Sequence, residues 1–283
     1  MAIIPNNEDF VRPPPIEPTS IIRVVSPAGA VKESALKAGR EYLETAGYQV
    51  NQPETVTERY NYFAGNAASR AQELHKAVLL AKGHESIIWA ARGGYGSSQM
   101  AEYGLTVEML HDLHQELTQN PKWLVGYSDI TSISLHLWAR ARVLVLHGPM
   151  VVNITEYSPE AVEETWKILK GSEPLTQVFT GNIRYGKGQG LLANGRSLAG
   201  IAFGQMTMPD GYASDEYGAY DVLLVPKVLH ELLEPLGIPI ITDVDIGHDT
   251  RTARPIVLGA QAEIHGNGVL KVLVPGCYDG VKM

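Results

Sequence analysis

A serine stands at a tight turn between an apolar run and a segment with helical spacing. Residues 123–125 form the apolar run, and Gly126-Tyr127-Ser128-Asp129 follows it directly. A serine at such a strand-to-helix turn is typical of a nucleophile elbow, in which the hydroxyl stands clear of the sheet and backbone N–H groups of the helix start turn toward it. These donors can stabilise an oxyanion, and the N–H of Asp129 is the natural first donor. The alternative is an ordinary helix N-cap, a position that favours Ser and Asp.

A second unusual segment is Arg92-Gly93-Gly94-Tyr95-Gly96, which follows the apolar run 86–91. A glycine here, Gly93 or Gly94, is a natural second oxyanion donor, because a side chain would block close approach of the backbone. Position 99 is Gln, so the segment lacks the glycine spacing of a dinucleotide fingerprint, and it has no Gly-Lys-Ser/Thr of a phosphate-binding P-loop. A phosphate site or a simple turn stays open as an alternative.

A serine hydroxyl needs a general base to become a good nucleophile. The chain has nine histidines, and most of them fall in expected helices. His147 ends an expected strand, and His248 lies in a loop after the expected strand 238–244. A purely structural role is the alternative for any single loop histidine, so the sequence favours His248 without deciding for it.

Apolar runs alternate with helical patterns through the first half of the chain, which predicts an α/β fold with right-handed crossovers and a parallel sheet covered on both faces. We expect a three-layer N-terminal domain over residues 21–152 that carries the nucleophile, preceded by a flexible arm over residues 1–20. The expected strands are 21–25, 48–50, 86–91, 123–125 and 143–146, and the expected helices are 32–46, 67–82, 107–119, 130–141 and 160–170.

The texture changes after about residue 152, where glycine-rich breaks separate short strands. We interpret residues 153–185 as a linker and residues 186–283 as a smaller mixed α/β C-terminal domain that carries the histidine. Its expected elements are a helix at 222–233 and strands at 238–244, 255–264 and 268–274.

Composition excludes several classes of protein. Lys and Arg number 23 against 31 Asp and Glu, which gives a net charge of −8, and no basic stripe predicts a nucleic-acid partner. Cys277 is the only cysteine, so neither an internal disulfide framework nor a cysteine metal cage can form. The start lacks the pattern of a signal peptide, and no apolar run reaches membrane-spanning length, so we expect a cytoplasmic protein that does not contact the membrane.

Several short motifs occur together in a recognisable order. They are Tyr62-Phe63-Ala64-Gly65, Arg70, the segment 92–96, Val125 to Thr131, His147 to Met150, Gly200 to Gln205, Gly247-His248 and Pro255 to Gly259. With these motifs the chain resembles the LD-carboxypeptidases of the S66 serine peptidases, also called muramoyltetrapeptide carboxypeptidases. The resemblance covers nearly everything from residue 21 to the end and is most specific in the first half.

The resemblance implies a cytoplasmic enzyme of cell-wall recycling that removes terminal D-alanine from a murein tetrapeptide by cutting an L,D bond. It also implies a Ser-His-Glu triad with no cofactor or metal, a small peptide or muropeptide substrate and a homodimer. Carried over by motif, Ser128 is the nucleophile and His248 the base, while Asp129 and Gly94 supply the oxyanion N–H groups. A free tetrapeptide, a muropeptide and a peptide antibiotic all stay open as substrates, and Arg92, Arg251 and Arg254 are candidates for holding the substrate carboxylate.

One departure from the family pattern concerns the triad acid. The run from Tyr185 to Asn194 leads almost directly into Ser197, so the strand-helix unit that carries the family's triad glutamate is missing. Glu216 is a weak candidate for a replacement acid, as are Asp243 and Asp245. The alternative function is therefore a catalytically weak or inactive muropeptide-binding relic of the same fold. A third possibility is a nucleotide- or phosphate-binding protein that uses the glycine loop.

Overall fold

The computed structural model describes residues 10–81, 87–185, 190–191, 197–198, 200–205 and 231–277. The chain divides into two compact units. The larger unit comprises residues 7–175, 254–260 and 274–283, and the smaller comprises residues 1–6, 176–253 and 261–273.

A six-stranded sheet forms the centre of the larger unit. Its strand order is β12-β5-β4-β3-β1-β2, and the strands are β1 (Ile21–Val25), β2 (Gln49–Asn51), β3 (Ile87–Ala90), β4 (Trp123–Val125), β5 (Val145–His147) and β12 (Ile256–Leu258). All neighbouring strands are parallel except β12, which pairs antiparallel with β5. Every residue of β3 and β4 is buried, because helices cover both faces of the sheet.

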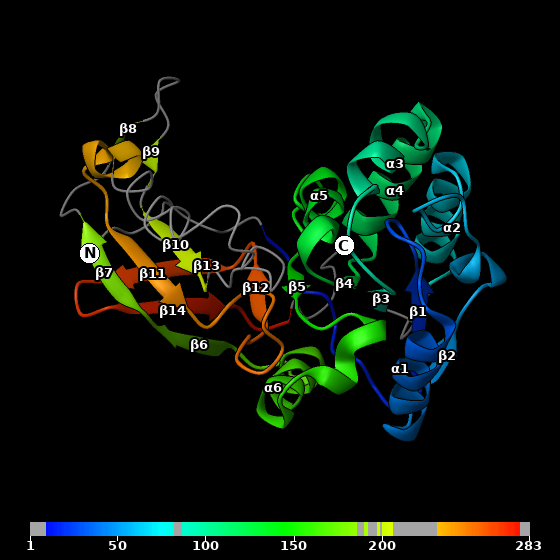
Figure 1. Ribbon diagram of the computed structural model, residues 1–283, viewed down its shortest axis with the longest axis horizontal. Coiled ribbons are helices and arrows are strands. Elements are labelled where there is room, and N and C mark those ends of the chain that lie inside the picture. Colours follow the sequence, from blue (N-terminus) through cyan, green and yellow to red (C-terminus); the bar gives the residue numbers. More distant parts are fainter. Residues whose placement is uncertain are drawn as a thin grey trace, which may run out of the picture. The chain divides into compact units, whose positions relative to one another are not determined.

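Helices flank this sheet in two layers, with α1 and α6 on one side and α2, α3 and α4 on the other (Figure 1). The α-helices of this unit are α1 (Glu33–Thr45), α2 (Ala67–Leu80), α3 (Ser97–Tyr103), α4 (Val107–Gln119), α5 (Thr131–Ile133) and α6 (Pro159–Lys170). The short helical turns η1 (Glu54–Thr57), η2 (Ser128–Ile130), η3 (Ser134–Trp138) and η4 (Val151–Glu156) join them. The predicted α/β class and three-layer arrangement are confirmed.

Local sequence explains where two of the helices, α2 and α6, begin. The Asn66 side chain accepts a hydrogen bond from the Ser69 N–H (2.9 Å) at the start of α2, as its position before the helix predicts. Ser158 does the same for α6, and Pro159 occupies the first position of that helix, where its missing N–H costs nothing.

Buried tryptophans tie the core to the loops. The indole N–H of Trp89, in β3, donates to the Pro149 carbonyl (2.7 Å), and that of Trp138 donates to the Lys122 carbonyl (2.7 Å). Both rings are fully buried, so each places a large apolar surface in the core while its polar atom stays satisfied.

Three sequence predictions for this unit need correction. Residues 130–141, expected as one helix, instead form the 3₁₀ turn η2, the single turn α5 and the π-turn η3. Helix α3 was not expected. The expected strand 255–264 is two strands, because Gly259 adopts a φ of +90° between β12 and β13 (Gln261–His265) and the chain changes sheets there.

The smaller unit is built from short strands. One sheet has the order β10-β11-β7, with β10 (Ile201–Gly204), β11 (Ile240–Val244) and β7 (Asn182–Tyr185), and another has the order β13-β14-β6, with β14 (Val269–Val274) and β6 (Leu175–Thr180). Strands β8 (Gly190–Leu191) and β9 (Ser197–Leu198) form an antiparallel pair, and η5 (Glu234–Leu236) precedes β11. Most of the expected helix 222–233 lies outside the described residues, and so does Glu216.

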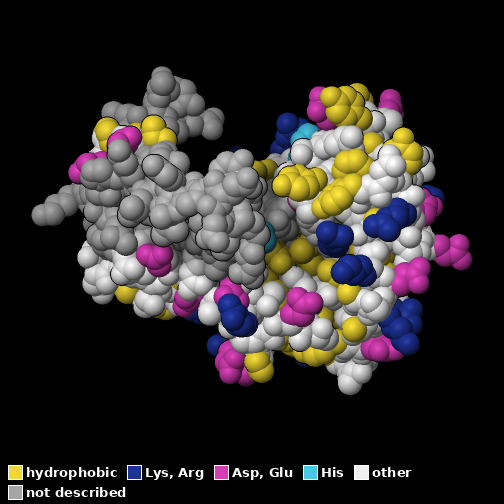
Figure 2. Space-filling model, viewed as in Figure 1, with side chains coloured by type: hydrophobic (Ala, Val, Ile, Leu, Met, Phe, Trp, Pro, Cys, Tyr) yellow, Lys and Arg dark blue, Asp and Glu magenta, His cyan; other side chains and the backbone are white. Residues whose placement is uncertain are grey.

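The surface of the larger unit carries both signs of charge. On the face in Figure 2, Lys and Arg side chains are interspersed with Asp and Glu over its described residues. Among the described helices, none combines the length and apolar character that crossing a membrane requires.

Candidate active site

Ser128 occupies a sharp elbow at the carboxyl end of β4. Tyr127 is extended, with φ −141° and ψ −175°, and Ser128 then has a φ of +60° before η2 begins. The left-handed region is unfavourable for a residue with a side chain, so the surrounding structure must enforce this conformation. Tyr127 holds the N-cap position of η2, so Ser128 is the first residue of this turn and not the residue before it.

Glycines allow the chain to turn this tightly. A β-carbon at position 126 would lie 2.9 Å from Ile130 Cγ2 and 3.0 Å from Ala90 Cβ, closer than real β-carbons come. Gly93, from the neighbouring loop, is buried against the elbow, and its β-carbon would lie 3.3 Å from the Tyr127 carbonyl oxygen and 3.5 Å from Ser128 Cβ. The glycine loop, residues 92–96, therefore lies beside the serine, with room for little more than a β-carbon between Gly93 and Ser128.

The glycine loop has a conformation that other residues adopt only with strain. Gly94 has a φ of +102° and Gly96 a φ of +120°. A β-carbon at position 94 would also collide with the Tyr62 hydroxyl, and one at position 96 would lie 2.7 Å from Arg70 Nη1. Both positions therefore need glycine for two reasons: the backbone adopts a positive φ there, and a β-carbon would have no room.

Asp129 links the elbow to the helix that follows the glycine loop. Its carboxylate accepts a hydrogen bond from the Ser97 N–H at the start of α3 (2.9 Å), and its carbonyl accepts one from the Ser97 hydroxyl (2.5 Å). The carboxylate therefore occupies the position near the α3 N-terminus where an anion would bind. This arrangement disfavours phosphate binding by the glycine loop, which was one of the alternatives from the sequence.

Tyr127 is buried beside the serine and is held by a residue that the sequence analysis did not identify. The Asn153 side-chain amide donates to the Tyr127 hydroxyl (2.8 Å), while its oxygen accepts from the Met150 N–H (2.9 Å). Burial raises the pKa of the Tyr127 hydroxyl, so it stays protonated at neutral pH. Asn153 follows His147-Gly148-Pro149-Met150, but nothing in its sequence context marks it for this role.

His248 lies in the smaller unit, on the loop that follows β11, and its side chain is exposed. Gln205, at the end of β10, braces this loop on both sides. Its N–H donates to the carbonyls of Val244 (3.1 Å) and Ile246 (2.9 Å), and its amide group donates to Asp245 (2.9 Å). The Thr252 hydroxyl donates back to the Gln205 side-chain oxygen (2.8 Å). The motif Gly200 to Gln205 was noted in the sequence, but this bracing role was not predicted.

The candidate replacement acids differ in their surroundings. Asp243 is exposed and accepts hydrogen bonds from Asn182 (2.9 Å) and Thr242 (2.9 Å), and Asp245 accepts from Gln205. Glu216 is outside the described residues. Among the residues that the structure describes, no group of three or more His, Cys, Asp or Glu side chains could hold a metal ion.

The three candidate arginines also differ. Arg254 forms a two-point ion pair with Glu164 (2.8 and 2.9 Å), and the exposed Arg251 does the same with Asp249 (2.7 and 2.9 Å). Arg92 belongs to the glycine loop, donates to the Ala30 carbonyl (2.6 Å) and lies 5.7 Å from the centre of the Tyr62 ring. Arg92 is the candidate in the loop that lies beside Ser128.

In the larger unit, then, the elbow brings Ser128, Asp129 and the glycine loop together. Family models match both halves of the chain: the LD-carboxypeptidase N-terminal domain over residues 22–148 and the LD-carboxypeptidase C-terminal domain over residues 190–264. A provisionally named carboxypeptidase of Synechocystis sp. is 27% identical over 96% of this chain and 100% of its own length. A murein tetrapeptide carboxypeptidase of Pseudomonas aeruginosa is 30% identical over 56% of this chain and 49% of its own length.

Solved structures share the fold. A muramoyltetrapeptide carboxypeptidase from Oxalobacter formigenes superposes with a TM-score of 0.68 at 18% identity, covering 91% of this chain and 99% of the other. An MccF-like protein from Bacillus anthracis gives a TM-score of 0.71 at 16% identity, covering 93% and 99%. The alignment with the Synechocystis protein runs over 329 positions, more than the 283 residues of this chain, so that relative carries segments that this chain lacks.

Proposed function

Because this chain belongs to the LD-carboxypeptidase family, we propose that it is a serine-type carboxypeptidase that cuts an L,D peptide bond and releases terminal D-alanine from a murein tetrapeptide. The observation that carries the proposal is the left-handed Ser128 at the end of a buried strand, with a glycine loop packed against it. Stored backbone strain of this kind is typical of nucleophile elbows, where it presents the hydroxyl to the substrate.

In the proposed mechanism, the Ser128 hydroxyl attacks the carbonyl carbon of the scissile bond while His248 takes its proton. The N–H groups of Gly94 and Asp129 donate to the oxygen that becomes negatively charged. The C–N bond then breaks, His248 gives the proton to the leaving D-alanine amine, and an acyl-enzyme remains on Ser128. Water, deprotonated by His248, hydrolyses this ester and restores the serine.

The acid that orients His248 is the open element of this mechanism. We propose that one carboxylate among Glu216, Asp243 and Asp245 takes the role of the family's triad glutamate. Losing the triad acid reduces kcat by about 10⁴ in other serine peptidases, so the correct carboxylate should stand out in a series of Asn and Gln substitutions. Asp245 lies three residues before His248 and is held by Gln205, which gives it a defined position on the histidine loop.

A second candidate function is a muropeptide-binding protein with weak or no turnover. It is favoured by the absence of the family's glutamate-bearing segment, since Tyr185 to Asn194 leads almost directly into Ser197, and by the segments that the Synechocystis relative carries in addition. In this case the crevice at Ser128 would still bind the peptide, but no acid would hold the imidazole in its productive tautomer.

Family resemblance supports the remaining parts of the proposal. We propose that the enzyme acts in the cytoplasm as a homodimer and needs no cofactor. Sedimentation velocity of the purified chain measures the oligomeric state directly.

The deciding experiment measures D-alanine release from a muramoyl tetrapeptide by the intact protein and by Ser128→Ala. We expect release by the intact protein and a loss of at least about 10⁴-fold in kcat for the variant. Absence of release by the intact, folded protein, together with a rise in melting temperature on adding the muropeptide, would instead establish the binding function.

A further inference from the structure

Arg70 is a charged side chain buried deep in the larger unit, close to the site but without a role in the proposed mechanism. It lies in the first turn of α2, and only 2% of its surface is exposed. Burying a guanidinium is costly unless acceptors replace the lost water, and both terminal nitrogens of Arg70 have acceptors while its Nε has none among the described residues. The groups to which Arg70 donates hydrogen bonds therefore indicate which segments it holds in place.

Those partners belong to two different loops around Ser128. Arg70 Nη1 donates to the Pro27 carbonyl (2.7 Å), which lies in the loop after β1, and to the Gly96 carbonyl (2.7 Å), which ends the glycine loop. Nη2 donates to the Gln99 side chain (2.8 Å) in α3. The two loops also meet directly, because the Gly29 N–H donates to the Gly93 carbonyl (3.2 Å).

The space for the guanidinium is made by the glycine loop itself. Gly96 lacks a side chain where a β-carbon would lie 2.7 Å from both Arg70 Nη1 and Phe63 Cδ1, and the guanidinium carbon lies 4.9 Å from the centre of the Phe63 ring. Burial lowers the pKa of the Arg70 guanidinium, and the negative charge of Asp129, beside the proposed nucleophile, partly opposes this shift. A lysine could not reproduce this arrangement, because its single ammonium nitrogen lacks the second arm that binds Gln99 while Nη1 binds the carbonyls of Pro27 and Gly96.

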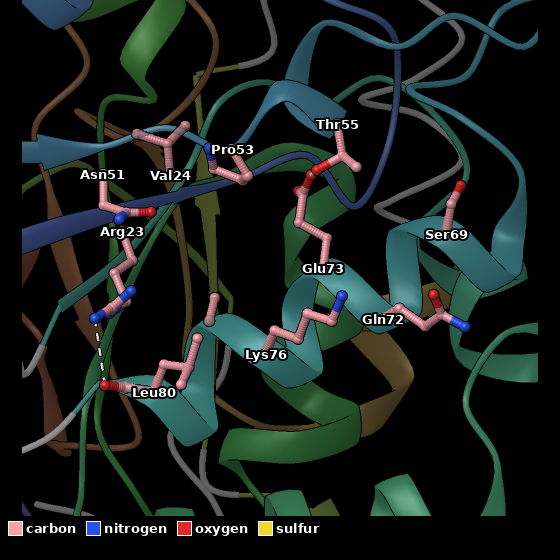
Figure 3. A pocket seen from close by; sticks show the side chains of 11 residues that line it. Arg23, Val24, Asn51, Pro53, Thr55, Ser69, Gln72, Glu73, Lys76 and Leu80 are labelled. Atoms are coloured by element: carbon pink, nitrogen blue, oxygen red, sulfur yellow. Dashed lines mark hydrogen bonds between the residues drawn. The ribbon is translucent and has the colours of Figure 1, made fainter.

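One turn further along α2, Glu73 binds the loop after β1 at Ser26, next to the Pro27 carbonyl that Arg70 binds. Its carboxylate accepts a hydrogen bond from the Ser26 N–H (2.6 Å) and another from the Thr55 hydroxyl. Glu73 lines a pocket of about 220 Å³ beside α2, in which Thr55 points toward it and Lys76 lies on the next turn (Figure 3). Adjacent carbonyl and N–H groups of the loop, at Pro27 and Ser26, are thus bound by two side chains spaced i and i+3 on one helix.

We propose that Arg70 is a positioning residue for the reaction at Ser128: it fixes the glycine loop, residues 92–96, in the conformation that stabilises the oxyanion. The inference rests on the proposed function, since it assigns the part that Arg70 plays in that reaction. Arg70 acts through the loop and makes no contact with the reacting atoms in this account. Glu73 secures the partner loop, residues 26–30, against which the glycine loop is fixed.

The test compares two fully buried cations of the larger unit. Lys122, which is also 2% exposed, donates to Glu116 (2.6 Å) and to the Asn120 carbonyl (2.9 Å), and it precedes β4 at the end of the strand opposite to Ser128. Arg70→Gln and Lys122→Gln both remove a buried positive charge and should both lower the melting temperature. Arg70→Lys keeps the positive charge, so the role of Arg70 can still be tested if Arg70→Gln fails to fold.

For D-alanine release at a temperature where all variants are folded, we expect Arg70→Lys and Arg70→Gln to lower kcat by about 10- to 100-fold, with KM changed less than threefold, because a small displacement of catalytic groups has effects of this size. Lys122→Gln should keep kcat within about twofold. Equal losses of kcat in the Arg70 and Lys122 variants, or wild-type kcat in both Arg70 variants, would overturn the inference.

A second measurement does not depend on turnover. Hydrogen exchange followed by mass spectrometry should show at least tenfold faster exchange of the amides of residues 92–97 in Arg70→Lys, with no change there in Lys122→Gln. If the intact protein releases no D-alanine, the proposed function fails, and this measurement still decides the role of Arg70. Unchanged exchange of residues 92–97 in Arg70→Lys refutes the inference whatever the activity.

Discussion

The loops that carry Ser128 and His248 both follow a strand, but different forces hold them. The serine elbow follows a fully buried strand, and a β-carbon at Gly126 would lie only 2.9 Å from Ile130 Cγ2. The histidine loop is partly exposed, and a single residue, Gln205, supports it through hydrogen bonds of both its backbone N–H and its side-chain amide.

Because of this difference, Ser128 and His248, the two proposed catalytic residues, should respond differently to mutation of the loops that carry them. Close packing is unforgiving, because overlapping atoms cost several kcal/mol, so the elbow either forms correctly or the unit loses stability. A hydrogen-bonded loop loses only about 1 kcal/mol for each bond, so its geometry can change while the fold persists. Mutations at the elbow should therefore appear in stability, and mutations at the histidine loop mainly in kcat.

The largest effect is expected for Gly94→Ala. The residue has a φ of +102°, and the new β-carbon would collide with the Tyr62 hydroxyl, so we expect the free energy of unfolding in urea to fall by about 3 kcal/mol. Gly47→Ala is the matched control, since Gly47 has a φ of +96° with no atom within 4 Å and should lose only about 1 kcal/mol. Equal losses at the two positions would show that packing against the glycine loop is unimportant. Adding Tyr62→Phe to Gly94→Ala should recover part of the loss.

The next effect tests the histidine loop. Gln205→Ala keeps the backbone bonds to Val244 and Ile246 but removes those to Asp245 and Thr252, so kcat should fall by about tenfold or more while stability falls by only about 1 kcal/mol. Thr252→Val removes just one of these bonds and should have a smaller effect on kcat. A kcat unchanged in Gln205→Ala would mean that the loop keeps His248 in place without this brace.

Glu73 gives a pH-dependent effect in the buried framework of the larger unit. Burial raises the pKa of its carboxyl in the folded protein above the value of about 4.3 expected for an unfolded chain. The stability that this group contributes is therefore fully present below the unfolded pKa and is lost as pH rises through the folded pKa. Glu73→Gln removes this loss while its oxygen can still accept from the Ser26 N–H.

We expect the melting temperature of Glu73→Gln, relative to wild type, to increase as pH rises above the unfolded pKa and to level off above the folded pKa. Differential scanning calorimetry at several pH values measures this difference. Lys122→Gln serves as the control, because it removes a buried charge that does not belong to a carboxyl group. If the difference in melting temperature between Glu73→Gln and wild type does not change with pH, the raised pKa of the Glu73 carboxyl is contradicted.

The smallest effect concerns strain at the nucleophile itself. Ser128→Gly should raise the free energy of unfolding by about 0.5–1 kcal/mol, since glycine adopts a φ of +60° without steric cost, partly offset by its greater entropy when unfolded. Ser128→Ala keeps the strain and should leave stability within about 0.5 kcal/mol of wild type. Equal stabilities for the Gly and Ala variants, measured by urea unfolding, would show that the elbow stores no strain.

Much of the fold of the larger unit could be predicted from the sequence. Its strands are continuous apolar runs that alternate with amphipathic helices, and this local pattern is sufficient to indicate a parallel sheet covered on both faces. The predictions of secondary structure were wrong where the local sequence pattern was misleading. Residues 255–264 look like one strand, but Gly259 turns the chain from one sheet to another, and only pairing partners elsewhere in the chain reveal this.

The candidate site was predictable to a similar degree. Ser128 and the glycine loop stand out because glycines and a serine interrupt apolar strands, which is a signal within a few residues. Gln205 and Asn153 could not be identified in the same way, since an amide side chain has no special pattern when its partners lie on other loops. Arg70 was noted within a motif, but its link to Pro27 and Gly96 depends on how α2 packs.

By itself, the sequence determined that a serine would stand at the end of a buried strand beside a glycine-rich loop, because apolar runs and chain breaks are encoded locally. The tertiary structure alone decided that Ser128 takes a left-handed conformation, that Asp129 caps α3 and that Arg70 joins two loops. These features depend on contacts between residues about 30 or more positions apart, and such contacts form only when the sheet and its helices have packed.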